Sequence, residues 1–198
     1  MKKLFAAILL IITPVCIFAA SKSKSSGEAG FEAGIGTGYV FYGDSATKDL
    51  VSHMNSEKFA RFIISGDVGF FVPLAEYVSF VADAELMNDL FWKGGDHCYF
   101  FDYSFNGGVK VMPGFGGLGF TVDYCLGRRT SCIKYDSSTT ETRSTEWGNG
   151  FKFAVDYDIH YEKKDGVCPV VGAYWRHMPR GDNFSDNTIS IYLKLLFR

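Results

Sequence analysis

The sequence is poor in proline and in net charge, and beyond its first twenty residues it lacks an apolar run of transmembrane-helix length. The 5 prolines against 22 glycines favour strands joined by tight turns over a disordered chain. A net charge of −2 excludes the broad basic surface that a nucleic-acid partner would require. No segment has a clear helical repeat of apolar residues. The sequence instead is 47% apolar and 17% aromatic, over a length that suits a single domain.

The first twenty residues are typical of an export signal. Lys2 and Lys3 give a positive start, and residues 4–18 are almost entirely apolar. This apolar stretch is shorter than the about 20 residues that a comfortable transmembrane helix needs. We therefore expect cleavage near Ala20 and export of the mature chain.

The mature chain is expected to start with a short linker over residues 21–30, followed by the folded domain over residues 31–198. Lipidation of Cys16 is a less favoured alternative to cleavage near Ala20, because Val15 occupies the position where a small residue is usual. Since no second long apolar run follows, we expect no membrane-spanning helix in the mature protein.

Apolar and polar residues alternate along most of the mature chain, with the period of two that predicts β-strands. The pattern is clear in FKFAVDYDIHY (151–161) and in the final ISIYLKLLFR (189–198). Most of the predicted strands have about 10–14 residues, whereas a tilted membrane-spanning strand needs about 9–11. The eight predicted strands cover residues 31–41, 59–71, 77–87, 97–112, 118–128, 151–161, 169–178 and 188–198.

The connections between these strands are predicted to alternate in length. The short ones are 72–76, 113–117 and 162–168, and the long ones are 42–58, 88–96, 129–150 and 179–187. This alternation places every long loop at one end of an antiparallel sheet and both termini at the other. Outer-membrane barrels have such an asymmetry, with short periplasmic turns and longer extracellular loops.

The alternation alone does not decide which face of the sheet is outside, because a soluble lipocalin-like barrel also alternates. The polar face here contains many glycines, which suit a crowded interior, and it carries charges of both signs that can pair inside a narrow barrel. The apolar face is continuous and has aromatic residues near the strand ends, as expected at membrane interfaces. We therefore predict an inverted barrel whose lumen holds a charge network of Glu32, Arg61, Asp67, Asp83, Glu85, Asp102, Lys110, Asp123, Lys152, Asp156, Asp158, Arg176 and Lys194.

The chain ends inside its last predicted strand, at Phe197 and Arg198. In a bilayer every backbone polar group must be satisfied, so this strand is expected to pair with the first and close the sheet. The pattern over about residues 29–198 resembles the small eight-stranded outer-membrane barrels of the OmpX and OmpW type. It also resembles short spirochaetal (treponemal) outer-membrane barrels of uncertain function.

The resemblance implies an all-β, up-and-down transmembrane barrel in an outer membrane. It also implies that the last strand is the signal read by the barrel-assembly machinery, although the usual pattern ends on the aromatic itself and here Arg198 follows Phe197. The resemblance to OmpW-like barrels also implies an alternative function, which is the passage of small hydrophobic molecules. A wide aqueous pore is not expected, because the lumen of an eight-stranded barrel is normally filled.

Two short motifs and one long loop contain the candidate binding residues. GFGGLG at 114–119 matches a nucleotide-binding pattern, but a strand follows it where that site needs a helix, so we interpret it as a hairpin turn. Arg180, Gly181 and Asp182 match the integrin-recognition tripeptide, and an ordinary polar loop is the favoured alternative. Tyr135 and Trp147, in the Ser- and Thr-rich segment 129–150, are the other candidate contacts for an extracellular partner.

Catalytic and metal sites are not expected. His177 with Asp182 or Ser185 would suit a lipid-modifying enzyme, the second alternative function, but no geometry follows from the spacing. A metal site on Asp96, His97 and Cys98 is disfavoured because adjacent strand residues point to opposite faces. Asp156, Asp158 and His160 share a face, where charge pairing in the lumen is favoured over acid–base chemistry. No cofactor is predicted.

Four cysteines remain after the export signal, an even number that permits disulfides in an exported protein. Cys98 and Cys132 lie near the outer ends of the fourth and fifth strands. A register with Val111 opposite Leu118 brings Cys98 beside the neighbour of Cys132, so a disulfide between them is a candidate.

These patterns together predict a non-enzymatic, integral outer-membrane protein. Its expected partners are membrane lipids, the barrel-assembly machinery and an extracellular or host ligand bound through the surface loops, with no nucleic acid. The favoured function is that of a surface or membrane-structural protein whose loops meet the environment or a host, with an adhesin as one candidate, and OmpW-like passage of small hydrophobic solutes is the alternative.

Overall fold

The computed structural model describes residues 29–198, apart from residues 115, 136–138, 163–165 and 182–183. The predicted export signal, with Ala20 and Cys16, lies outside the described residues, as does most of the predicted linker. Within the described part of the chain, no helix is long and apolar enough to cross a bilayer. The elements are β1 (Gly30–Tyr42), α2 (Ser45–Ser56), β2 (Ala60–Ala75), β3 (Val78–Lys93), β4 (Asp96–Val111), β5 (Leu118–Lys134), β6 (Glu141–Ser144), β7 (Gly148–Asp158), β8 (Val167–Arg180) and β9 (Phe184–Phe197).

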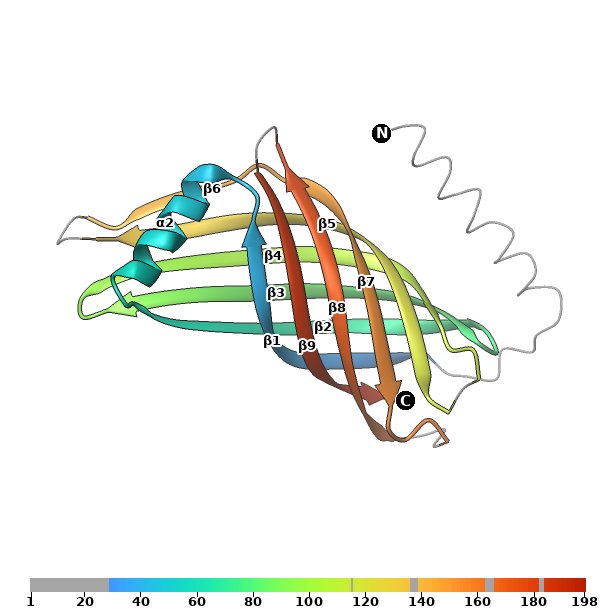
Figure 1. The fold of residues 1–198 in the computed structure, drawn as a ribbon. Helices are drawn as coiled ribbons and strands as arrows, with labels where there is room; N and C mark the ends of the chain where they lie inside the picture. Colours follow the sequence, from blue (N-terminus) through green and yellow to red (C-terminus); the bar gives the residue numbers. More distant parts are fainter. Residues whose placement is uncertain (1–28, 115, 136–138, 163–165, 182–183) are drawn as a thin grey trace.

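The strands close into an antiparallel barrel with eight positions in its wall (Figure 1). β5 pairs with β6 over Thr130–Ile133 and with β7 over Leu118–Gly127, so β6 and β7 share one position. β1 pairs with β9, starting with Phe31 opposite Phe197, and this closes the sheet. The prediction of an eight-stranded barrel closed by its last strand is therefore confirmed.

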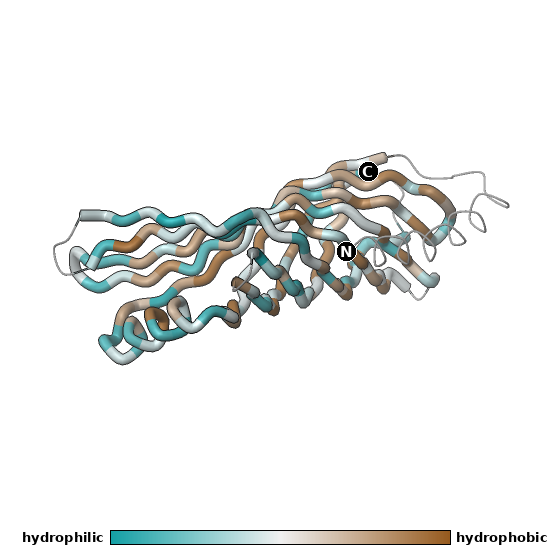
Figure 2. Tube along the Cα trace, turned by 90° about the horizontal axis from the view of Figure 1, so that it is seen from above, coloured by the Kyte–Doolittle hydropathy of each residue, from teal (hydrophilic) through white to brown (hydrophobic). Residues whose placement is uncertain are grey.

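The apolar face of the sheet is on the outside. Figure 2 shows hydrophobic and hydrophilic residues alternating along the strands. Large apolar side chains on the outer surface are exposed, for example Phe31 (71%), Val68 (62%) and Ile191 (62%), while the polar residues between them face inward and are largely buried. Such a surface suits hydrocarbon and not water, so the predicted inversion of the barrel is confirmed.

The barrel interior is crowded, and glycines make room in it. A Cβ atom at Gly172 would lie 2.5 Å from Cζ of the Tyr192 ring. A Cβ atom at Gly119 would lie 2.5 Å from Oδ1 of Asp156 and 2.7 Å from Cε of Lys110. These approaches are closer than van der Waals contact, so side chains at either position would displace the groups that fill the lumen.

At the end of the barrel that holds Gly30 and Phe197, here called the terminal end, the predicted turn between β4 and β5 is confirmed, whereas β2 continues to Ala75 through most of the predicted turn 72–76. GFGGLG forms a hairpin turn, in which Gly114, Gly116 and Gly117 have φ of +82°, +53° and +93°. β5 follows this turn directly. The helix that a nucleotide-binding loop would need is therefore replaced by a strand, as predicted.

The opposite end, here called the outer end, differs from the prediction because its strands run further than expected. Most of the predicted loop 88–96 is strand, with a tight turn at Gly94 and Gly95 between β3 and β4, and 179–187 is mostly strand. The predicted loop 129–150 is largely a hairpin of β5 with β6. Strands β2 to β5 therefore project beyond β1 as a sheet (Figure 1).

The predicted loop 42–58 contains the helix α2, which the sequence pattern missed. Asp44 caps its N-terminus, accepting a hydrogen bond of 2.7 Å from the Thr47 backbone N–H. Burial alone would raise the pKa of the Asp44 carboxyl, but hydrogen bonds from Thr47 and Arg129 outweigh burial and hold the pKa below its usual value. Thr47, Val51 and Met54 form the buried face, at the spacing of one helical stripe.

Helix α2 covers an apolar cluster inside the outer end of the barrel. Val51 and Met54 of the helix pack in this cluster with side chains from β1 to β4. The cluster therefore holds α2 against strands β1 to β4 at the outer end. The outer apolar cluster consists of Val40, Tyr42, Val51, Met54, Phe59, Ile63, Met87, Phe91, Cys98 and Phe100.

Candidate functional site

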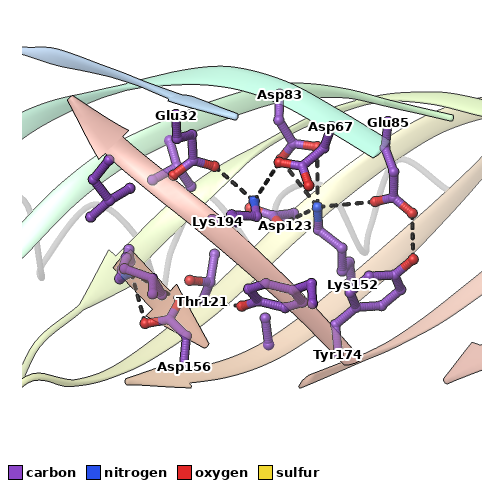
Figure 3. A pocket seen from close by; sticks show the side chains of 16 residues that line it. Glu32, Asp67, Asp83, Glu85, Thr121, Asp123, Lys152, Asp156, Tyr174 and Lys194 are labelled. Atoms are coloured by element: carbon purple, nitrogen blue, oxygen red, sulfur yellow. Dashed lines mark hydrogen bonds and ion pairs between the residues drawn. The ribbon is translucent and has the colours of Figure 1, made fainter. Parts of the chain in front are cut away.

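The centre of the lumen is filled by carboxylates gathered around two lysines (Figure 3). Lys152 Nζ lies 3.1 Å from Asp83 Oδ2, 3.4 Å from Glu85 Oε2 and 3.3 Å from Asp123 Oδ2. These three acids come from β3 and β5, whereas Lys152 is on β7, so one ammonium group links three strands. Its ion pairs are almost fully buried, with all four side chains at most 6% exposed.

Two further groups extend this network toward the terminal end. Lys194 on β9 pairs with Glu32 and Asp67, each at 2.8 Å. Lys110 pairs with Asp156 at 2.8 Å, and the Tyr192 hydroxyl donates to the same carboxylate at 3.3 Å.

At the terminal end itself, Arg198 forms an ion pair with Asp158. The Asp158 carboxylate also accepts a hydrogen bond of 2.9 Å from the His160 backbone N–H. Arg198, which follows Phe197, thus neutralises the Asp158 carboxylate, which is almost fully buried.

Toward the outer end the charges alternate in a chain. Arg176 lies 3.3 Å from Glu85 and 3.2 Å from Asp102. Arg180 then pairs with both Asp102 and Asp186. The chain leads through Asp186 to the mouth of the barrel.

Arg129 ends this chain at helix α2. Its guanidinium lies 2.7 Å from Asp186 and 3.1 Å from Asp44, the helix cap, and it donates to the Thr47 hydroxyl at 3.0 Å. The helix is therefore attached to the lumen network through its first turn. A row of alternating charges therefore runs from the centre of the lumen to α2, in the order Glu85, Arg176, Asp102, Arg180, Asp186, Arg129 and Asp44.

The central cavity left by these side chains is small. It has a volume of about 30 Å³ and is lined by six carboxylates and three lysines of the network. A water molecule needs at least about 10–15 Å³ measured in this way, so the cavity has room for about two. The lumen therefore contains no large pore at its centre.

The structure places all thirteen predicted lumen residues inside the barrel, and it adds Asp44, Asp89, Arg129, Arg180 and Asp186. Asp89 accepts hydrogen bonds from Arg61 at 2.9 Å and from the Tyr42 hydroxyl at 2.7 Å. Asp89, Arg129 and Asp186 were missed because they fell in predicted loops. Their signal was present, since each continues the inward positions of its own strand.

The interpretation of Arg180 as an exposed adhesive residue is wrong. Its side chain is 0% exposed and lies within the lumen network. Gly181 forms the turn after β8, with φ of +58°, and Asp182 lies outside the described residues. A partner on the surface has no access to the Arg180 guanidinium.

Tyr135 and Trp147 lie in two different settings. Tyr135 follows β5 at the tip of the outer hairpin, where its hydroxyl and Nε2 of His53 on α2 are 3.2 Å apart. Trp147 is 47% exposed and stacks near Tyr103 and Phe105 on the outer wall, with ring centroids 5.7 and 6.4 Å away. Trp147 thus belongs to the aromatic belt of the barrel, and Tyr135 belongs to the outer end.

The candidate disulfide between Cys98 and Cys132 is not formed, and both are free thiols. The ladder pairs Cys98 with Ile133 and Tyr99 with Cys132, so Cys98 points into the barrel while Cys132 points outward. The predicted register was wrong by two residues, because Val111 pairs with Phe120.

The candidate chemical sites are occupied by structural contacts. His177 Nδ1 lies 3.0 Å from Asn187 Oδ1, and Ser185, its predicted partner, pairs instead with Pro179 in the ladder. His97 stacks on Tyr99 at 4.7 Å. Among the described residues, no group of three or more His, Cys, Asp or Glu side chains is placed to hold a metal ion.

No family model matches this sequence, and no curated protein matches it. Solved structures with similar folds do exist. Ail, the attachment invasion locus protein of Yersinia pestis, has a TM-score of 0.60 at 12% identity, over 86% of this chain and 99% of that one. The fold is that of a small outer-membrane β-barrel.

Two further structures of this small outer-membrane barrel type agree with the assignment. Ail in complex with the heparin analogue sucrose octasulfate has a TM-score of 0.60 at 10% identity, over 86% of this chain and 99% of that one. Neisserial surface protein A has a TM-score of 0.51 at 12% identity, over 83% of this chain and 95% of that one. At such low identity the likeness establishes the barrel fold and not a shared ligand.

Proposed function

We propose that the protein is an integral outer-membrane barrel whose body is closed to bulk solutes and whose outer end meets the environment or a host surface. The observation that carries this proposal is the contrast between a lumen filled with paired charges and an outer end that projects as a sheet and a helix. Membrane lipids are the partner of the apolar outer wall. β9, which closes the barrel, is the segment that the barrel-assembly machinery would receive.

The proposed contact surface comprises α2, the turn between β3 and β4, and the hairpin of β5 and β6. The contact between Tyr135 and His53 supports this choice, because it joins the hairpin tip to the helix in one surface. The complex of Ail with a heparin analogue is one case of a barrel of this fold binding a ligand.

We infer that the protein is not an enzyme and needs no cofactor. The lumen carboxylates are held by cations, as Asp156 is by Lys110 and Asp158 by Arg198. His177 is on the outer wall, where its Nδ1 lies 3.0 Å from Asn187 Oδ1. These contacts favour structural roles for the groups that an acid–base or nucleophilic mechanism would use.

The proposed orientation is tested by thiol labelling of intact cells with a membrane-impermeant maleimide. Cys132 points outward on the projecting sheet, whereas Cys98, Cys125 and Cys168 are 0% exposed. We expect labelling of the native protein and its loss in Cys132→Ser. Labelling only after the cells are broken would place the projecting end inside the cell and overturn the proposal.

The proposed contact function is tested by shortening the outer hairpin. Replacing residues 135–139 by Asn-Gly keeps the β5–β6 ladder and installs a favoured two-residue turn. We expect cells displaying the native barrel, but not this variant, to adhere to cultured host cells or to immobilised heparin. Replacing the terminal-end turn 113–116 by Asn-Gly is the matched control. Equal adherence of all three proteins, or none by the native one, would contradict the proposal.

A second candidate function is the lateral passage of small hydrophobic molecules, and one seam in the wall favours it. β1 pairs with β2 only over Gly30–Gly36, so residues 60–64 of β2, which pair with β3 on one side, have no paired strand on the β1 side. Thr37 Oγ1 donates to the Ile63 carbonyl at 2.7 Å across this seam. The outer apolar cluster lies directly behind, under α2.

Passage through this seam requires α2 to move, so loosening the helix tests it. Val51→Ser with Met54→Ser removes two apolar contacts that hold α2 on the cluster. If the seam conducts, this variant should take up N-phenyl-1-naphthylamine into proteoliposomes faster than the native protein. Unchanged uptake, with the barrel shown to be folded by its gel mobility without heating, would exclude this route.

A further inference from the structure

A cavity of about 220 Å³ opens at the outer end, between the first half of α2 and the β5–β6 hairpin. It is separate from the central lumen cavity and has two chemically different sides. Leu50, Phe100, Ile133 and Phe184 form the apolar side, while Arg129 and Arg143 lie on the polar side. An amphiphilic lining of this kind orients a ligand that has one polar end.

Arg143 is aimed at the concave side of the projecting sheet. It lies opposite Ser131 in the β5–β6 ladder, and Ser131 follows the inward positions of β5. Its ion pair with Glu141 measures 2.8 Å, but the two side chains are 77% and 61% exposed. Exposed pairs of this kind are weak, so Arg143 can exchange Glu141 for a ligand at little cost.

Arg129 forms the buried floor of the polar side. Its side chain is 2% exposed, and its terminal nitrogens are held by Asp186, Asp44 and Thr47. Its Nε, in contrast, has no hydrogen-bond partner among the described residues. A buried donor without an acceptor is costly, so an acceptor supplied by a ligand would be favoured here.

On the polar side of the cavity, the group without a partner is a hydrogen-bond donor, so a ligand must supply an acceptor. The Asp44 carboxylate, which also lines the cavity, already accepts from Thr47 and Arg129. A ligand therefore gains by bringing a carboxylate or sulfate group, which accepts several hydrogen bonds at once. A cationic ligand would instead meet two arginines.

The volume limits the apolar part of the ligand. A cavity of about 150 Å³ holds benzene, so this cavity suits an aromatic ring with a short chain or a comparable aliphatic body. We propose that it binds a small anionic amphiphile, with the anionic group between Arg143 and Arg129 and the apolar body against Leu50 and Phe100. This site is independent of host-cell contact through the hairpin tip.

The test uses 4-phenylbutyrate as the probe and 4-phenylbutyramide as its uncharged counterpart. Protein purified from outer membranes and placed in lipid nanodiscs is titrated by calorimetry. We expect saturable binding of the carboxylate and weaker binding of the amide. Arg143→Gln should weaken carboxylate binding about tenfold or more, as expected for a lost charged hydrogen bond, and Arg143→Lys should restore part of it.

Two variants complete the test. Lys48→Gln removes a positive charge from α2, outside the cavity lining, and should bind like the native protein. Ala46→Trp, at the cavity rim, should block binding. The proposal is overturned if the native protein shows no saturable binding, if Arg143→Gln binds like Lys48→Gln, or if the amide binds as well as the carboxylate. Loss of hairpin-dependent adherence alone would leave this binding intact.

Discussion

The role of the lumen network is tested most directly by Lys152→Met, which removes one buried ammonium and keeps a side chain of similar length. Glu85 retains Arg176 as a partner at 3.3 Å. Asp83 and Asp123, in contrast, form no ion pair with another cation among the described residues. Breaking a buried pair in this way costs about 3–5 kcal/mol, because it leaves uncompensated charge. Asp83 keeps a hydrogen bond of 2.6 Å from the Asn106 amide, but both carboxylates lose their cation, so we expect a loss of about 4–5 kcal/mol.

The assay is urea unfolding in phospholipid vesicles, followed by tryptophan fluorescence and by gel mobility without heating. Lys93→Met is the matched control, because its pair with Glu57 is about half exposed on both sides, and exposed pairs contribute less than about 1 kcal/mol. Adding Asp83→Asn and Asp123→Asn to Lys152→Met should recover much of the lost stability. A loss below about 1 kcal/mol in Lys152→Met would refute the claim that the network stabilises the barrel.

Three further predictions follow from other contacts. Arg180→Met should lower the free energy of unfolding by about 3 kcal/mol, measured by urea unfolding, and a stability equal to the native one would place its guanidinium outside the lumen. Gly172→Leu should cost about 1–3 kcal/mol by overpacking, because its Cβ would meet Tyr192, and a matched Gly95→Leu variant, which has open space, serves as the control in the same assay. The pKa of the Asp44 carboxyl is held below its usual value, so its stabilisation of α2 should be complete above about pH 3.9 and be lost as the pH falls through the folded-state pKa. Hydrogen exchange of the helix amides, corrected for intrinsic rates, measures this loss. An identical pH profile in Asp44→Asn would contradict the prediction.

The barrel and the side that faces lipid were predictable because a period of two sorts residues into two faces along the whole strand. The inward positions of β9, for example, carry Ser190, Tyr192 and Lys194, and the outward ones carry Ile189 and Ile191. Sheet closure follows once the outward face is apolar, because an open edge cannot lie in hydrocarbon. Both inferences use only local composition and one physical constraint.

The strand ends and the register were not predictable in the same way. Glycines and charges at 88–96 and 179–187 suggested loops, although Asp89 and Asp186 continue the inward alternation. The disulfide prediction depended on the register between the fourth and fifth strands. A shift of two residues leaves every side chain on the same face of the sheet, so the alternation of apolar and polar residues could not detect the error. Cys98 therefore lies opposite Ile133 in the ladder, and not beside Ser131 as predicted.

Helix α2 and the position of Arg180 depend on tertiary contacts that no local pattern contains. The helix has a short apolar stripe and gains its stability from the outer apolar cluster and from Arg129, which is far away in sequence. Arg180 appeared in an ordinary polar turn, and its burial results from Asp102 and Asp186 lying across the lumen. Long-range pairing of this kind decides between an exposed tripeptide and a structural arginine.

The charged groups differ in exposure between the centre of the barrel and its outer end, and this difference decides where a ligand can bind at low cost. At the centre, Lys152 and Lys194 are each shared between carboxylates, and the cavity has room for only a few waters. At the outer end, Arg143 has only an exposed partner and the Arg129 Nε has none among the described residues. A ligand that enters the centre must break buried ion pairs, whereas one that binds beneath α2 displaces only the exposed pair of Arg143 with Glu141. The energetics therefore favour recognition at the outer end, with the barrel body as its rigid support.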